Sequence, residues 1–411
     1  MESTLVAQLF LALALIIGAA QLGGSAARSI GQPRVFGELL AGIILGPTLL
    51  NMLHWGLFDQ PELLQTTSDQ LAQLGVLLLM FTIGLEVHFD ELLSVGKVAL
   101  WSGATGGLAP VLLVVPAVLA FDYSFKSALF AGVVLAATSV SISAQTLLEL
   151  GVLRTREGFG LLATAVVDDI VALLLLSVEV AAQGSNASIG DLVWIIARMI
   201  LYLAGALAVA WFIIPVLFNW IHRTPQIASG LSSFALIAAL VFGWSAEILG
   251  GIAAITGAFI AGLGFGHATQ RVQTEVENTV REISYAFLVP IFFVNVGLHA
   301  DLTQIGLGTL PLAGVLLAAA VVSKVGGSWI GARLGGFTNG EAFRLGICRI
   351  SRGEVGLIIA SLGLANGLLN SNLYEPLFLV ILLTTIITPP LVRLSFQRRA
   401  DSTPEFSTKQ A

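Results

Sequence analysis

The sequence predicts an all-α polytopic membrane protein with about 13 transmembrane helices. Three observations lead to this fold class. The chain has few charged residues, its apolar runs are long enough to cross a bilayer, and its basic residues gather in alternate loops. Together they exclude a string of soluble domains and indicate one membrane unit over residues 1–411.

The composition alone places the chain in lipid. Of its 411 residues 56% are hydrophobic and 11% are charged, whereas a soluble domain has about 25% charged residues. The mean hydropathy is +0.92. A single cysteine, Cys348, excludes a disulfide framework and a cysteine-rich metal site. The basic residues form no contiguous patch, so we expect the bilayer as a partner and no nucleic acid.

Apolar runs separated by proline, glycine and charge clusters define the spans. Their approximate limits are 5–24, 35–53, 70–87, 98–121, 127–149, 158–182, 193–219, 227–247, 249–267, 283–299, 309–332, 342–366 and 374–395. The first span has neither a basic n-region nor a small-residue cleavage site, so we expect it to be retained.

The basic residues in the loops predict the orientation. Thirteen spans place 14 basic residues on the face of the C-terminus and only Lys126 and Arg198 on the face of the N-terminus. The 14 are Arg28, Arg34, Lys97, Arg154, Arg156, Arg223, Arg271, Arg281, Arg333, Arg344, Arg393, Arg398, Arg399 and Lys409. The C-terminus is therefore predicted to be cytoplasmic and the N-terminus outside, in a bacterial inner membrane.

Two pairs of segments indicate an internal repeat. Residues 80–86 (MFTIGLE) are echoed by residues 292–299 (FFVNVGLH), and residues 37–46 by residues 255–266. Each pair joins spans that are seven apart. Because seven is odd, the second copy crosses the membrane in the opposite direction, which predicts two inverted six-helix repeats, as in many secondary transporters.

Ionisable residues inside the spans mark the candidate site. Each costs about 2.5–3.5 kcal/mol at mid-bilayer and therefore needs a partner, a cavity or a function. Asp168 and Asp169 lie about 16 Å below the start of their span, and they point in different directions because neighbours on a helix are about 100° apart. One carboxylate can face Lys324, at similar depth, and the other an aqueous cavity where it holds a proton or a hard cation. The alternative is an inert buried ion pair.

Polar residues interrupt two spans at corresponding positions of the two repeats. Residues 136–146 read AATSVSISAQT, and residues 347–356 read ICRISRGEVG. Hydroxyls can satisfy backbone groups where a membrane helix unwinds, and paired interruptions point to a transporter's binding site. Arg352 and Glu354 would then neutralise the ends of half-helices. Ordinary packing by Ser and Thr is the alternative for the first segment.

The ordered set Thr-Ser-x-x-Ile-x-Ala, Leu-Glu-Leu-Gly, Asp-Asp and Ser-Arg-Gly-Glu resembles the monovalent cation:proton antiporter-2 family over about residues 5–395. The resemblance implies a homodimeric antiporter in which two broken helices cross within a core domain. The core helices would be about 98–182 and 309–395, the scaffold or dimer helices about 5–87 and 193–299, and residues 396–411 a short cytoplasmic tail.

The resemblance also implies roles for single residues. Asp169 would be the main carrier of Na⁺ and protons, and Asp168 would contribute to the cation site while pairing with Lys324. Thr138 and Ser139 would line the same site. The crossing would further involve Ser141, Ser351, Arg352 and Glu354. No cofactor is expected, because Na⁺ and H⁺ are the transported substrates.

The expected activity is Na⁺/H⁺ exchange by alternating access, and we do not expect an enzyme. Potassium/proton exchange is less favoured, because the potassium-efflux branch of the family usually has Gln-Asp in place of Asp-Asp. A sodium-coupled organic-anion symporter is a second alternative, since the amides of broken helices can bind a carboxylate. A channel would need a continuous polar pore, and an aspartyl protease would need carboxylates from two helices.

Overall fold

Helix occupies every predicted span in the computed structural model, which describes residues 2–182, 189–217, 230–265, 278–303, 305–365 and 367–400. No strand occurs among these residues. Within the same ranges, nine helices are long and apolar enough to cross a membrane by themselves. The prediction of an all-α polytopic membrane protein is therefore confirmed.

The helices follow the predicted spans closely. In the N-terminal part they are α1 (Glu2–Ser29), α2 (Arg34–Leu45), the 3-10 turn η1 (Met52–His54), α3 (Pro61–Glu86), α4 (Phe89–Ser94), α5 (Gly96–Leu119), α6 (Phe125–Ala136), α7 (Val140–Glu149) and α8 (Arg156–Ala182). In the middle they are α9 (Ile189–Ala208), the π-helical segment η2 (Val209–Ile213), α11 (Gly230–Ser245), the π-helical segment η3 (Ala246–Gly250) and α12 (Ala254–Phe265). In the C-terminal part they are η4 (Ser284–Leu288), α14 (Val289–Leu298), the 3-10 turn η5 (Leu307–Thr309), α15 (Leu310–Leu334), α16 (Asn339–Cys348), α17 (Glu354–Ala365) and α18 (Ser371–Ala400).

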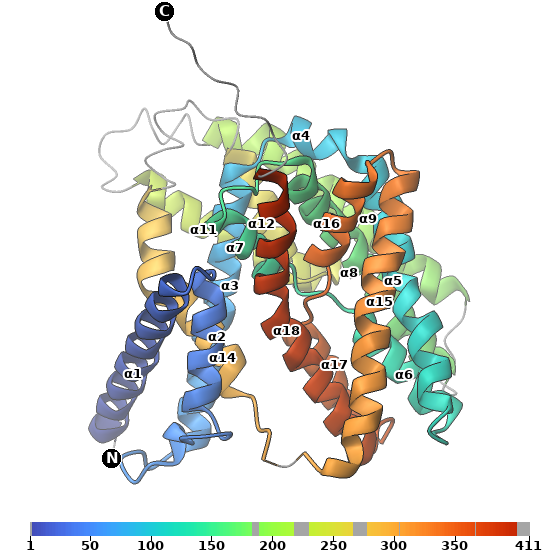
Figure 1. Ribbon diagram of the computed structural model, residues 1–411. Coiled ribbons are helices and arrows are strands. Elements are labelled where there is room, and N and C mark those ends of the chain that lie inside the picture. The colour runs from blue at the N-terminus through green and yellow to red at the C-terminus, as the bar shows by residue number, and fades with distance from the viewer. Residues whose placement is uncertain are drawn as a thin grey trace, which may run out of the picture.

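Two of the spans are broken in the middle. The fifth consists of α6 and α7, and the twelfth consists of α16 and α17. In Figure 1, α6 and α17 lie in the lower half of the molecule, whereas α7 and α16 lie in the upper half. The two broken spans therefore run in opposite directions, as the repeat predicts. The inverted relation of the complete six-helix units stays a prediction.

Buried apolar side chains form clusters that group the helices. One cluster joins residues of α5, α6, α15, α17 and α18, and includes Val114, Phe130, Leu316 and Ile381. Another joins residues of α3, α11 and α12, together with the end of α9. The largest cluster contains residues from both groups of helices and holds them together.

Glycines permit the closest approach between long helices. A Cβ atom on Gly331 of α15 would lie 2.3 Å from the carbonyl oxygen of Trp101 on α5, so no other residue fits without moving a backbone. The same pair of helices is joined by a hydrogen bond of 2.6 Å from the Thr105 hydroxyl to the Gly327 carbonyl. This packing joins α5 and α15 directly, next to the broken spans.

The two ends of the described chain lie at opposite ends of the molecule (Figure 1), as an odd number of crossings requires. Helix α18 continues to Ala400, so the first residues of the predicted tail are helical, and residues 401–411 lie outside the described ranges. Arg223, Arg271 and Lys409 lie outside them as well. Arg198, predicted to lie at the outer face, is part of α9.

Candidate functional site

The two breaks meet in the interior of the protein. The backbone N–H of Ser139, between α6 and α7, donates a hydrogen bond of 2.9 Å to the carbonyl of Ser351, between α16 and α17. Gly353 allows this contact, because a Cβ atom there would lie 2.7 Å from the Ser139 Oγ. The unwound segments therefore touch directly, at residues where the family resemblance implies a crossing.

Two buried cations cover the carbonyl end of α6. The Lys324 Nζ donates to the Ala136 carbonyl at 2.6 Å and to the Thr138 Oγ1 at 2.7 Å. The Arg352 Nε donates to the Leu135 carbonyl at 3.0 Å. Positive charge is favourable here, because the C-terminal end of a helix carries a partial negative charge and unbonded carbonyls.

Arg352 also binds carbonyls outside α6. Its Nη1 donates to the Ile350 carbonyl at 2.8 Å and its Nη2 to the Ala320 carbonyl at 2.9 Å, and its own carbonyl accepts from the Thr385 hydroxyl. The side chain is fully buried. One guanidinium thus satisfies the Leu135 carbonyl at the end of α6 and the Ile350 carbonyl of the unwound segment, and it also bonds a carbonyl within α15 that accepts from the Ser323 hydroxyl as well.

The serines of the two breaks act in different ways. The Ser143 hydroxyl donates to the Cys348 carbonyl at the end of α16 at 2.5 Å. The hydroxyls of Ser139 and Ser141 lie 3.1 Å apart. Ser351 contributes its carbonyl to the crossing, whereas its buried hydroxyl makes no hydrogen bond to the described residues.

The ion-pair partner of Asp168 is Arg349. The Arg349 Nη2 contacts the Asp168 Oδ1, and the two side chains are 1% and 7% exposed. The prediction that Lys324 pairs with Asp168 is wrong in this structure, because the Lys324 ammonium is bound instead to the end of α6. The sequence places both Lys324 and Arg349 inside spans. It does not show that Arg349, at the end of α16, meets Asp168, whereas Lys324, on α15, meets the end of α6.

Arg349 is held by α5 and α15 on its other side. Its Nη1 donates to the Ser102 carbonyl, to the Ser102 Oγ at 3.1 Å and to the Ser328 Oγ at 2.9 Å. A Cβ atom on Gly106 would lie 2.3 Å from the same nitrogen, so this glycine makes room for the guanidinium. The charge of Asp168 is therefore neutralised by a cation that is itself tightly positioned.

Asp169 has different surroundings, as the angle between neighbouring helical residues predicts. Its Oδ2 accepts a hydrogen bond of 2.6 Å from the hydroxyl of Thr256 on α12. Asp169, Thr256 and Thr138 line one small cavity beside the crossing, together with apolar side chains of α3, α8 and α17. The side chain of Glu354 lies outside the described part of the structure; its backbone begins α17.

A family model described as "Sodium/hydrogen exchanger, transmembrane" matches residues 11–394 of the chain. The chain belongs to the sodium/hydrogen exchanger family. Among similar proteins, the Na⁺/H⁺-K⁺ antiporter GerN of Bacillus cereus is 35% identical over 389 residues, which cover 95% of this chain and 96% of GerN. A Na⁺/H⁺ antiporter of Enterococcus hirae is 33% identical over 382 residues, which cover 93% of this chain and 96% of the relative.

The exchanger also shares its fold with a solved structure. The sodium proton antiporter MjNhaP1 of Methanocaldococcus jannaschii superposes with a TM-score of 0.68, covering 95% of this chain and 97% of that one. The sequences are 15% identical, so the likeness concerns the fold alone.

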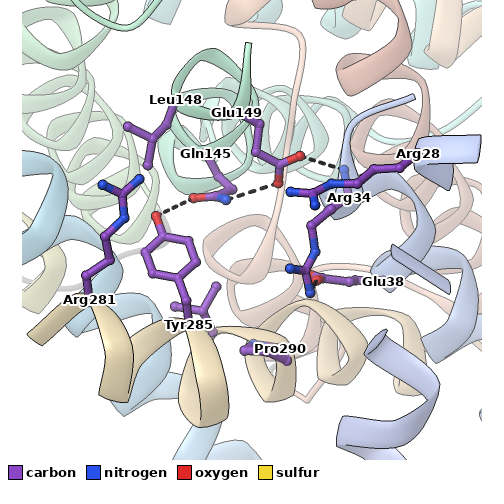
Figure 2. A pocket seen from close by; sticks show the side chains of 10 residues that line it. Arg28, Arg34, Glu38, Gln145, Leu148, Glu149, Arg281, Tyr285 and Pro290 are labelled. Carbon is purple, nitrogen blue, oxygen red and sulfur yellow. Dashed lines mark hydrogen bonds and ion pairs between the residues drawn. The ribbon is translucent and has the colours of Figure 1, made fainter. Parts of the chain in front are cut away.

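Two larger cavities flank the crossing in this exchanger. The first, which we call the inner cavity, measures about 280 Å³. It is lined by Arg28, Arg34, Glu38, Gln145, Leu148, Glu149, Arg281, Tyr285, Val289 and Pro290. Figure 2 shows how Tyr285, Gln145 and Glu149 point toward one another across it. The Tyr285 hydroxyl donates to the Gln145 Oε1 at 2.8 Å, and the Gln145 Nε2 donates to the Glu149 Oε1 at 3.0 Å. The Glu149 Oε2 accepts from the Arg34 backbone N–H at 2.5 Å, so α7 is bonded to both η4 and α2.

The second, the outer cavity, measures about 530 Å³ and lies between α3, α14 and α17. One of its polar residues is Asp69, whose Oδ1 accepts from the Asn295 Nδ2 at 2.8 Å and lies 3.3 Å from the His299 Nε2. The His299 Nδ1 lies 2.9 Å from the Asn295 carbonyl. Because both ring nitrogens face oxygen acceptors, the imidazolium is favoured, and the hydrogen bond to Asp69 raises the pKa of His299.

Sequence reasoning missed two residues of the site. Arg349 lies inside a predicted span, but the sequence did not indicate that it is the partner of Asp168. Thr256 carries no signal of its own, because one threonine in an apolar helix is typical of helix packing. Among the described residues, no three His, Cys, Asp or Glu side chains lie together as in a metal centre.

Proposed function

We propose that the protein exchanges a monovalent cation, Na⁺ in the first place, for H⁺, and that Asp169 is the shared carrier. The observation that carries this proposal is the position of Asp169. Its carboxylate lines a cavity beside the crossing together with Thr138, at the end of a half-helix. A carboxylate and a hydroxyl are oxygen ligands of the kind that hard cations prefer.

Competition at one carboxylate would couple the two fluxes. Asp169 holds either a proton or a cation, so each substrate leaves before the other binds. Asp168 does not compete in this scheme, because Arg349 already compensates its charge. We therefore assign Asp168 a positioning role rather than that of a second cation ligand, while Thr138 and Ser139 remain the proposed neutral ligands.

Alternating access needs two bodies that move against each other. We propose the core helices 98–182 and 309–395 as one body and the scaffold helices 5–87 and 193–299 as the other. The separate apolar clusters within each group support this division. Residues of both groups line the inner cavity and the outer cavity, which also supports this division.

Family membership supports exchange over organic-anion symport. GerN is named as an antiporter of K⁺ as well as Na⁺, so potassium is the second candidate cation. We propose a homodimer formed by the scaffold helices in a bacterial inner membrane, with the C-terminus cytoplasmic. The fourteen-to-two distribution of basic residues in the loops supports that orientation.

Purified protein in liposomes with an imposed pH gradient and an internal pH dye tests the proposal. Na⁺ is expected to dissipate the gradient in liposomes with the parent protein, and Li⁺ and K⁺ are then tested in the same way. Asp169→Asn is expected to abolish the response to each cation. Asp122→Asn is the matched control, because Asp122 is exposed in a loop at φ 61°, a conformation that asparagine tolerates. Exchange is disproved if no alkali cation dissipates the gradient, and the carrier role is disproved if Asp169→Asn matches the parent.

A further inference from the structure

We propose that Thr256 is a positioning residue that holds the empty, ionised Asp169 against the scaffold. The inference rests on the proposed carrier role of Asp169. The two side chains come from helices of the two proposed bodies, Asp169 from α8 and Thr256 from α12. Their hydrogen bond of 2.6 Å therefore crosses the surface along which the core moves.

Thr256 stands on a rigid support. It lies in the first turn of α12, directly after a tight turn in which Gly251 has the left-handed φ of 68°. The Ile252 N–H donates to the Ala246 carbonyl at 3.0 Å and closes this turn. A Cβ atom on Gly257 would lie 2.2 Å from the Phe242 carbonyl, so α12 packs closely against α11.

Arg198 anchors the same turn from outside. Its Nε donates to the Leu249 carbonyl and its Nη2 to the Ile248 carbonyl, each at 2.6 Å. These carbonyls lie at the end of η3, where the helix leaves them without partners. On the adjacent turn of α9, the Tyr202 hydroxyl donates to the Phe242 carbonyl at 3.1 Å. Thr256 is thus supported by α9, α11 and its own helix.

The chemistry of a hydroxyl makes this bond depend on what Asp169 carries. A threonine donates to an ionised carboxylate in a charge-assisted hydrogen bond, which is roughly twice as strong as a neutral one. A proton or a monovalent cation on Asp169 cancels that charge, so the bond weakens when the carrier is loaded. The contact is strongest for the empty carrier, and it opposes movement of the core without a substrate.

Thr256→Val removes the hydroxyl and keeps the shape of the side chain. Without the donor, the ionised carboxylate is less stabilised and the proton competes better with Na⁺. The pH profile of Na⁺-driven exchange is expected to move by about one unit to higher pH, which corresponds to a tenfold change and fits the loss of one hydrogen bond to a charged group. Thr256→Ser is expected to restore the parental profile.

Thr82→Val is the matched control. Thr82 is a buried threonine of α3 whose hydroxyl bonds the Leu78 carbonyl of its own helix at 2.9 Å. Its loss is expected to leave the pH profile unchanged. If Thr256→Val does not purify in folded form, Thr256→Ala takes its place with the same expected shift.

The outcomes separate the two proposals. A parent protein without cation-driven exchange disproves the proposed function. An active parent whose pH profile is the same as that of Thr256→Val disproves the role of Thr256. The role is also disproved if Thr256→Ser shifts as far as Thr256→Val, or if Thr82→Val shifts equally.

Discussion

Arg349 and Asp168 form an ion pair in the interior of the protein, with their side chains 1% and 7% exposed. Arg349 follows the last residue of α16, and Asp168 lies midway along α8, so the pair ties one broken span to a continuous one. Arg349 also compensates the negative charge of Asp168, the residue next to the proposed carrier Asp169. The contribution of the pair to the free energy of unfolding can be measured.

Arg349→Met is expected to lower the free energy of unfolding by about 3–5 kcal/mol, because it leaves the carboxylate of Asp168 buried without a partner. The double variant Arg349→Met with Asp168→Asn is expected to recover most of the loss. Denaturant unfolding in detergent measures both. The exposed pair of Arg156 and Glu341 at 3.1 Å is the control, and Arg156→Met is expected to cost less than about 1 kcal/mol. Equal costs for Arg349→Met and Arg156→Met would contradict the assignment.

Arg352→Met is expected to destabilise the crossing, because the buried carbonyls of Leu135 and Ile350 lose the donor that Arg352 supplies and each such loss costs about 1–3 kcal/mol. Arg352→Lys is expected to recover part of the loss, since an ammonium reaches fewer of these carbonyls than the guanidinium fork. Hydrogen exchange at the Ser139 N–H, which is bonded to Ser351 across the crossing, reports the effect locally. Unchanged protection of this amide in Arg352→Met would show that the arginine does not support the crossing.

Much of the fold could be predicted from the sequence, because hydropathy and charge are local properties. The spans followed from apolar runs, and the break at Thr138 and Ser139 followed from hydroxyls in the middle of one of them. The partner of Asp168 could not be predicted in the same way. Lys324 and Arg349 both lie inside spans, and only the rotation of α15 and the end of α16 decide which one meets the carboxylate. Thr256 was missed because its function depends on a contact with another helix.

Removal of the His299 imidazole is expected to alter stability in a pH-dependent way. The hydrogen bond to Asp69 raises the pKa of His299, so its contribution is fully present below the unfolded pKa of about 6.5. The contribution is lost as the pH rises through the higher folded pKa. His299→Gln is therefore expected to lower Tm by about 1–2 °C at pH 5.5, a size typical of a partly exposed pair, and to have no effect at pH 9. A loss of the same size at both values would mean that the charge of His299 is not involved.

Tyr285→Phe removes one hydroxyl that joins the proposed scaffold to α7 across the inner cavity (Figure 2). The loss of one neutral hydrogen bond, about 1 kcal/mol, is expected to raise the population of conformations with an open inner cavity about fivefold. A cysteine at Leu148, in a Cys348→Ser background, reports the opening by its rate of thiol labelling. Tyr374→Phe is the control, because Tyr374 contacts Ser361 at 3.4 Å on α17, within the proposed core. Equal labelling rates in Tyr285→Phe and the parent would refute a role for this contact in closure.

The two cations at the end of α6 have a consequence for the valence of the transported ion. Lys324 and Arg352 are fixed, fully buried charges that hold the carbonyls of Ala136 and Leu135. Coulomb repulsion scales with charge, so a divalent ion entering beside Thr138 meets twice the repulsion that a monovalent ion meets. Arg349 compensates the charge of Asp168, so Asp169 is the carboxylate of the proposed site that attracts either ion. At the proposed site, the charges that hold the helix break are therefore expected to disfavour Ca²⁺ and Mg²⁺ as well.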